Sequence, residues 1–225
     1  MGGVEGTLSC PRCGAPVQPP DRSSGDWQCE ACGPVQPLYV PSRVDREVLA
    51  AAVAEVTRGD GVPLWCPWPL PDGWLVTGVG WVADDRVGAC GSVLACSGPS
   101  PVTGEPADLL LVAESPGTGL AGRYVGSSGP DFGPSLADAM AAGPPHAKLK
   151  AGGHPTPMWS VPSGSDRSAY VGEVRAVWLV AVTWPATAGY LLADDLVLLD
   201  LAEWLPPEIA YGPRCARLEG VARNE

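Results

Sequence analysis

Two copies of the motif Cys-x-x-Cys-Gly constrain this 225-residue chain more than any other feature. The first runs from Cys10 to Gly14 and the second from Cys29 to Gly33, with fifteen residues between Cys13 and Cys29. Two intervening residues let one tight turn direct both sulfurs of a motif at the same point. The glycine that follows accepts a positive φ, so the chain can turn its N–H groups back toward the sulfurs.

This spacing matches the C-x₂-C-x₁₅₋₂₀-C-x₂-C pattern of zinc sites. We therefore predict that Cys10, Cys13, Cys29 and Cys32 bind one Zn²⁺ tetrahedrally. Iron is the alternative metal, and a pair of disulfides or redox dithiols is the alternative without metal. Four protein ligands leave no coordination position for a substrate, so the metal is expected to be structural. Residues 8–35 resemble a zinc ribbon of the rubredoxin-like kind.

The charge balance disfavours two classes of partner. Asp and Glu number 25 against 14 Lys and Arg, so neither nucleic acid nor an anionic membrane is an expected partner. The residues after Met1 show no signal-peptide pattern, and thiols kept for metal suit a reducing compartment. We therefore expect a cytoplasmic protein. The uncharged stretch 176–193 is predicted as a hairpin and not a membrane span, because turn residues interrupt it at 183–189.

The sequence divides into four predicted parts: a zinc ribbon at 1–38, a linker and amphipathic helix at 39–61, a body at 62–212, and a C-terminal tail at 213–225. The helix is predicted over 43–58 with Ser42 as its N-cap. Val44, Val48, Leu49, Ala52 and Val56 would form its apolar face.

The body has the pattern of an α+β fold with a mixed or antiparallel sheet, few helices and a long Gly/Pro-rich loop. Strands are predicted at 75–82, 92–96, 108–114 and 170–182, and a strand or short helix at 196–204. The continuous apolar run 109–113 indicates a central strand that is covered on both faces. Four further cysteines lack metal-site spacing and are expected to be small buried residues: Cys66, Cys90, Cys96 and Cys215.

Tryptophans alternate with prolines in the segment 65–74. The proline spacing favours extended backbone, which would display the rings of Trp65, Trp68 and Trp74 to a protein partner. The alternative is that these rings fold back onto the core.

Residues 115–169 show little periodicity and are predicted to form a long loop. Within it, Ser135 is expected to cap a short helix that ends near Ala142. Both lysines and both histidines of the chain lie within nine residues, which suggests an anion site for a phosphate or carboxylate. The candidate ligand-binding residues are Arg123, His146, Lys148, Lys150 and His154; the alternative is a solvated loop. Gly117-x-Gly119-x-x-Gly122 formally matches a dinucleotide fingerprint, but the residues after it do not look helical.

As a whole, the chain resembles uncharacterised actinobacterial proteins that have an N-terminal Cys-Pro-x-Cys-Gly ribbon and a body rich in Trp and Pro. The two cysteine motifs, residues 65–74, and residues 108–114 with the Pro-Gly turn after them carry this resemblance, which implies a source and no activity. Two hypotheses of function follow. The first is a non-enzymatic zinc-ribbon protein that engages an unknown protein partner. The second is a small-molecule enzyme or ligand sensor that uses residues 115–154.

Overall fold

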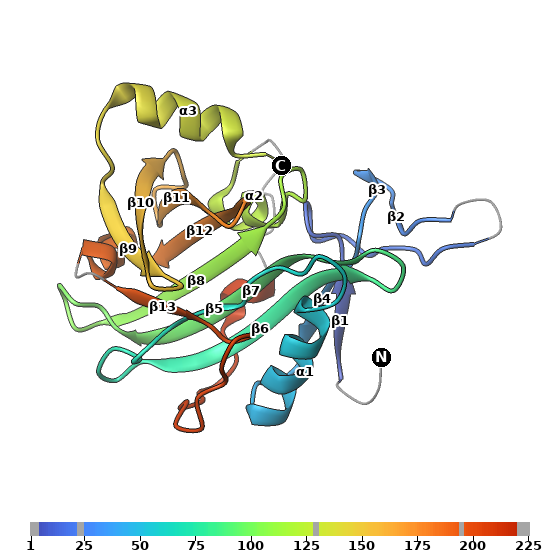
Figure 1. The fold of residues 1–225 in the computed structure, drawn as a ribbon, viewed down its shortest axis with the longest axis horizontal. Helices are drawn as coiled ribbons and strands as arrows, with labels where there is room; N and C mark the ends of the chain where they lie inside the picture. Colours follow the sequence, from blue (N-terminus) through green and yellow to red (C-terminus); the bar gives the residue numbers. More distant parts are fainter. Residues whose placement is uncertain (1–4, 22–24, 128–130, 194–195, 220–225) are drawn as a thin grey trace.

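The computed structural model of the chain describes residues 5–21, 25–127, 131–193 and 196–219 (Figure 1). An 11-stranded sheet forms its centre, in the order β1-β4-β6-β7-β8-β12-β11-β10-β9-β13-β5. Neighbouring strands are antiparallel except for β13 and β9, which run parallel. Among the described residues, no helix is long and apolar enough to cross a membrane. The predicted α+β class with a mixed sheet and few helices is confirmed.

The strands of this sheet have the following bounds: β1 Gly6–Ser9, β4 Leu38–Pro41, β5 Trp65–Pro67, β6 Leu75–Asp84, β7 Gly88–Pro99, β8 Pro106–Glu114, β9 Ala147–Ala151, β10 His154–Val161, β11 Ser168–Val174, β12 Val177–Trp184 and β13 Val197–Asp200. The helices are α1 Arg46–Val56, α2 Leu120–Val125 and α3 Gly133–Ala142, and two 3₁₀ helices, η1 and η2, span Ala186–Ala193 and Ala216–Glu219. A separate two-stranded sheet pairs β2 (Gln28–Cys29) with β3 (Gly33–Pro34).

Both faces of the sheet are covered, as the apolar run in β8 predicts. Leu109 and Leu111 pack into the core that also receives α1, while Leu110 and Val112 pack into a second core under α2 and α3. Figure 1 shows α1 and the pair α2 and α3 on opposite sides of the long strands. The edge strand β5 contacts β7 and β8, so the sheet curls over the first core.

Helix α1 is confirmed, but its predicted start is wrong. The helix begins at Arg46, and its N-cap is Asp45, whose carboxylate accepts a hydrogen bond of 2.9 Å from the N–H of Val48. Ser42 instead donates its hydroxyl to the carbonyl of Glu5, on the segment that leads into β1. Both residue types are good N-caps, but the Ser42 hydroxyl is used in the contact with Glu5, and Asp45 therefore sets the start of the helix.

The predicted loop over 115–169 is wrong, because this segment contains α2, β9 and β10; the short helix predicted within it to end near Ala142 is confirmed as α3. Strand β10 was not predicted because it contains two prolines. Pro155 and Pro157 both lie in this strand and pair with β9. Strand β10 pairs with β9 over residues 154–158 and with β11 only over residues 159–161, so both prolines lie in a part of β10 that is paired on one side alone. Helix α3 begins at Gly133 with Pro134 in its first turn, and Ser135 does not cap it.

The predicted strand 170–182 is two strands, β11 and β12, joined by a turn at Arg175 and Ala176, both of which have positive φ. The hairpin predicted over 176–193 is therefore wrong in its second half. After β12 the chain forms η1, whose Ala188, Leu191 and Leu192 are buried. Ala188 and Leu191 are three residues apart, which is one turn of a 3₁₀ helix, so they lie on the same side of it. The apolar content was thus correctly expected in the core but not as a strand.

Candidate metal centre

The four cysteines of the two motifs converge. Their Sγ atoms all lie within 4.8 Å of one another, and those of Cys13 and Cys29 are 3.5 Å apart. Cys10 and Cys29 are buried, whereas Cys13 and Cys32 are partly exposed. Tetrahedral coordination with Zn–S bonds of about 2.3 Å places sulfurs roughly 3.8 Å apart, which matches this cluster. The cysteines thus form a four-thiol group of the right size for one metal ion.

Each motif folds as a tight turn around its first sulfur. Gly14 and Gly33 have φ values of +78° and +73°, in the region that glycine adopts at low cost. The backbone N–H groups two and three residues after Cys10 donate to its sulfur, and the same pattern occurs after Cys29. These N–H···S bonds favour thiolate, which is the form that binds a metal.

The two buried thiols respond differently to these surroundings. Burial raises the pKa of Cys10 well above its ordinary value. At Cys29 burial acts in the same direction, but hydrogen bonds from the backbone N–H of Cys32 and from the Cys13 thiol outweigh it and lower the pKa. A divalent cation at the centre would supply the charge that turns all four thiols into thiolates.

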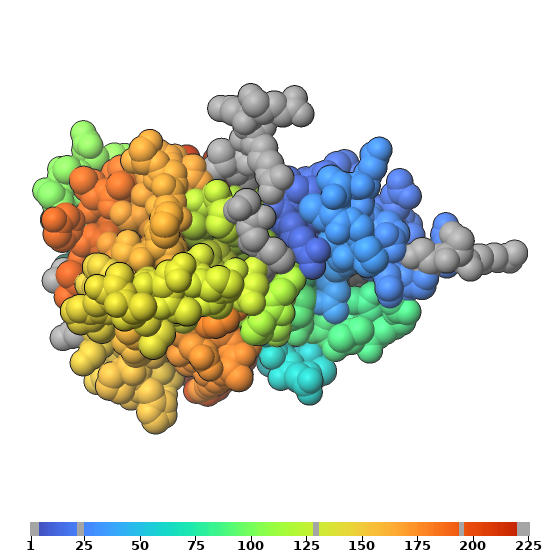
Figure 2. Space-filling view, turned by 90° about the horizontal axis from the view of Figure 1, so that it is seen from above, coloured from blue at the N-terminus to red at the C-terminus, as the bar shows by residue number. Residues whose placement is uncertain are grey.

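The body of the protein holds the ribbon from two directions. Strand β1 pairs with β4 in the large sheet. Arg12 extends from the first motif and donates to the carbonyls of Gly117 at 3.0 Å and Thr118 at 3.2 Å. In the opposite direction, Arg123 on α2 donates to Ser9 Oγ and to the carbonyl of Cys10, within the first motif. In Figure 2 the N-terminal residues lie directly against the yellow-green segment that follows β8.

The predicted anion-binding residues do not form one site. Arg123 is engaged with the ribbon, whereas Lys148 and Lys150 are exposed on β9, near the other end of the strand order. His154 is exposed at the start of β10, and His146 is an exposed residue whose Nδ1 accepts the N–H of Ser160 at 3.2 Å. The sheet therefore separates Arg123 from the lysines and histidines that were grouped with it by sequence.

Two of the three tryptophans proposed as partner contacts are core residues. Trp65 is 1% exposed and Trp74 is 4% exposed, so neither ring can reach a partner in the folded protein. Trp68 is partly exposed and lies edge-on to Trp204, with ring centroids 6.2 Å apart. Trp204 is 51% exposed. The expectation is thus corrected for Trp65 and Trp74, whose rings belong to the same core cluster as the apolar face of α1.

Three of the four other cysteines are buried as expected: Cys66, Cys96 and Cys215. Cys90 is the exception, since it is only partly buried and lines a cleft beside the ribbon. Burial raises the pKa of its thiol to about 11.

Sequence reasoning missed Glu114, which ends β8 and is fully buried. One carboxylate oxygen accepts the N–H groups of Leu120 at 2.6 Å and Ala121 at 3.3 Å, while the other has no partner among the described residues. Burial raises the pKa of Glu114 to about 7. The residues after the Gly117 fingerprint, which were not expected to be helical, do form the helix α2. The first N–H groups of this helix are hydrogen-bonded to the carboxylate of Glu114. The sequence does contain a signal that could have identified Glu114: it is a glutamate at the end of an apolar strand, directly before a Gly-rich turn.

These features define a class of protein: a large mixed sheet whose edge carries an N-terminal four-cysteine cluster that is able to hold a metal. A family model described as Family of unknown function (DUF6758) matches residues 4–218, and the chain belongs to this family. No curated protein and no solved structure matches the chain. Because one family model spans both the cysteine motifs and the sheet, the family is defined by the two together.

Proposed function

We propose that this protein is a non-enzymatic interaction or regulatory module whose Cys10, Cys13, Cys29 and Cys32 hold one structural Zn²⁺. The observation that carries the proposal is the convergence of four sulfurs within 4.8 Å. Zinc is favoured over iron because structural sites closed by four cysteines most commonly hold zinc. The set of thiols supports a cytoplasmic location, because thiols kept for a metal suit a reducing compartment, and the resemblance carried by the cysteine motifs supports an actinobacterial source.

Elemental analysis of protein prepared without oxygen tests the metal. We expect one zinc per chain, lost in Cys29→Ser and retained in Cys90→Ser, the matched control outside the cluster. Because the binding energy of such sites is folding energy, on the order of 10 kcal/mol, chelation should also unfold the ribbon. A chain that carries stoichiometric iron would contradict the choice of zinc, and a chain without metal would contradict the proposal as a whole.

The second motif is the part of the ribbon that is free to meet a partner protein. The first motif faces the body through Arg12, but Glu30 and Ala31, between the cysteines of the second motif, are both exposed. In Figure 1 β2 and β3 project away from the large sheet. The exposed tip of the second motif is therefore the proposed contact for the partner.

Quantitative co-purification from the native cell tests this contact. The double variant Glu30→Lys with Ala31→Arg changes the exposed tip and leaves all four sulfurs in place. It should keep its zinc and lose the partners of the wild-type chain. If the variant keeps both zinc and partners, the ribbon only stabilises the fold, and the proposed docking role is wrong.

A further inference from the structure

A cleft of about 350 Å³ lies between the ribbon and the body. The ribbon contributes Arg12 and Trp27 to its lining, and the body contributes Arg86, Cys90 and the turn 115–118. Binding sites for small molecules have volumes of about 300–1,000 Å³ and combine apolar walls with a few polar groups. The cleft meets both conditions, and neither the metal cluster nor the contact proposed for a protein partner uses it.

The cleft contains a cation with unused hydrogen-bond donors. Arg12 lines it and uses its Nε and Nη2 atoms to bind the carbonyls of Thr118 and Gly117. A guanidinium has five N–H donors, so within the part of the chain that the structure describes three remain without an acceptor, including both on Nη1. Among the described residues Arg12 forms no ion pair. Two hydrogen bonds fix the orientation of the guanidinium, which makes it a prepared site for a planar anion.

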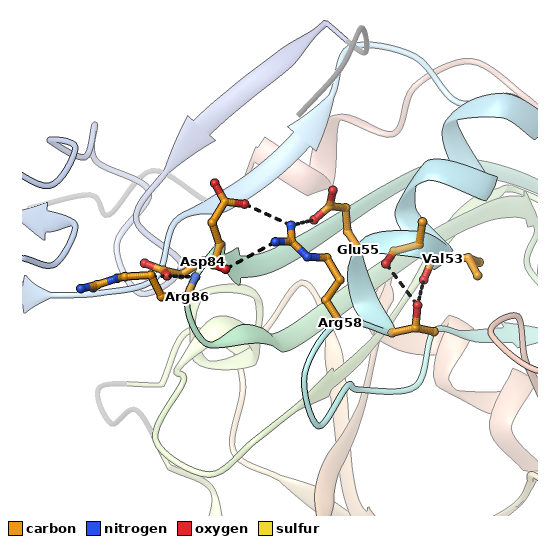
Figure 3. A network of polar contacts seen from close by, with 8 residues as sticks. Val53, Glu55, Arg58, Asp84 and Arg86 are labelled. Atoms are coloured by element: carbon orange, nitrogen blue, oxygen red, sulfur yellow. Dashed lines mark hydrogen bonds and ion pairs between the residues drawn. The ribbon is translucent and has the colours of Figure 1, made fainter.

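The other charged side chains of the cleft have a net charge of −1, which the charge of Arg12 balances. Arg86 donates to Asp26 of the ribbon at 2.6 Å and lies 3.6 Å from the carboxylate of Asp84. Figure 3 shows the contact between Arg86 and Asp84 at the end of β6, beside the pair of Glu55 and Arg58. Counting these three groups with Arg12, the cleft has two positive and two negative side chains. A ligand with one negative charge therefore suits it better than a dianion, which Asp26 and Asp84 would repel.

The remaining walls are apolar and include one aromatic ring. Trp27 lies on the ribbon side, and Val82 and Val87 lie on the body side, with prolines 11, 34 and 116 around them. A tryptophan face and proline rings present flat, rigid surfaces that favour a planar apolar group. The Cys90 thiol also lines the cleft and adds a polarizable apolar surface.

From these observations we propose that the cleft binds a small organic monocarboxylate, with its carboxylate on Arg12 and a flat apolar body against Trp27. The ligand would touch the ribbon and the body at once. Binding would therefore stabilise the contact between them, and it does so independently of any partner protein at the second motif.

Three probes test the ligand class on the zinc-loaded full chain, with zinc in excess. They are 2-naphthoate, its neutral isostere 2-naphthamide, and the dianion 2-naphthyl phosphate. Calorimetry should show that 2-naphthoate binds at least tenfold more tightly than either of the other two. Arg12→Gln should remove this preference, whereas Arg123→Gln, which weakens the ribbon contact from outside the cleft, should retain it.

A second measurement needs no variant. In the zinc-loaded protein, Cys90 is the cysteine that is neither a metal ligand nor buried, so iodoacetamide should alkylate it ahead of the others. Peptide mass spectrometry should show that 2-naphthoate slows this alkylation and that 2-naphthamide at the same concentration does not. Equal affinity for 2-naphthoate and 2-naphthamide, unchanged labelling of Cys90, or tighter binding of the phosphate would each overturn the proposal.

Discussion

Replacing Glu114 with glutamine should change how the stability of this protein depends on pH. The carboxyl group is fully buried, and burial raises its pKa from 4.5 to about 7, even though the N–H groups of Leu120 and Ala121 oppose that rise. The charge of Asp131 acts in the same direction as burial. In the folded protein Glu114 therefore holds its proton to a higher pH than in the unfolded chain.

The sign and size of the effect follow from this difference. Between pH 4.5 and 7 the folded state binds more protons than the unfolded state, so stability falls as the pH rises. One pKa unit corresponds to 1.36 kcal/mol, so the full effect is about 3 kcal/mol, of which about 2 kcal/mol falls between pH 5.5 and 8.5. Glutamine keeps an oxygen acceptor for Leu120 and does not titrate. The free-energy cost of burying the glutamine amide does not depend on pH, so it shifts the stability of the variant by the same amount at every pH.

Urea denaturation of the wild type and Glu114→Gln at several pH values between 5.5 and 8.5, with zinc in excess, measures the difference. The variant should gain about 2 kcal/mol relative to the wild type across this range. Glu173→Gln, at an exposed position on β11, reports the effect of losing one surface carboxyl. A difference between Glu114→Gln and wild type that stays constant with pH would refute the reasoning.

Three further perturbations follow from single contacts. Asp200→Ala should destabilise the protein by about 3 kcal/mol in urea, because this buried carboxylate accepts the N–H of Leu64 and pairs with Arg175 at 3.0 Å; a loss below 1 kcal/mol would contradict this role. Ala176→Gly should raise stability by about 1 kcal/mol, since Ala176 has a φ of +62°, and a loss of stability would show that the turn is not strained. Arg123→Gln should weaken zinc binding about tenfold in a chelator competition, because Arg123 supports Cys10 from outside the cluster; unchanged affinity would assign it to the fold alone.

The parts of this structure that were predictable from sequence depend on local patterns. Two residues between cysteines and a glycine after them determine a turn, so the four-sulfur cluster could be inferred without knowledge of the fold. The same holds for residues 109–113, where an uninterrupted apolar run requires cover on both faces of a strand. Both inferences use side chains that act through their immediate neighbours in the sequence.

The errors occurred where a distant contact overrides the local signal. Pro155 and Pro157 argue against a strand by themselves, yet pairing with β9 on one side is enough to keep them in β10. Arg123 was grouped with Lys148 by composition, but the fold uses it to hold the ribbon. Glu114 belongs to no recognisable sequence motif. Its role depends on a helix that begins six residues later, and on the burial of both the carboxylate and the start of that helix.

Hydrogen bonds are donated in both directions between the ribbon and the body, and they join residues that lie far apart in the sequence. The sequence of either region alone therefore does not predict its contact with the other. Arg12 donates from the first motif to carbonyls 105 and 106 residues away, and Arg123 donates back to the same motif from α2. Between these two arginines, Glu114 caps α2 and so fixes the helix from which Arg123 extends. Folding of the four-cysteine cluster therefore orders the turn after β8, and folding of the sheet positions the residues that support the cluster. Such mutual dependence favours one cooperative unit, in which the cysteine cluster and the sheet stabilise each other across a contact that also forms the walls of the cleft.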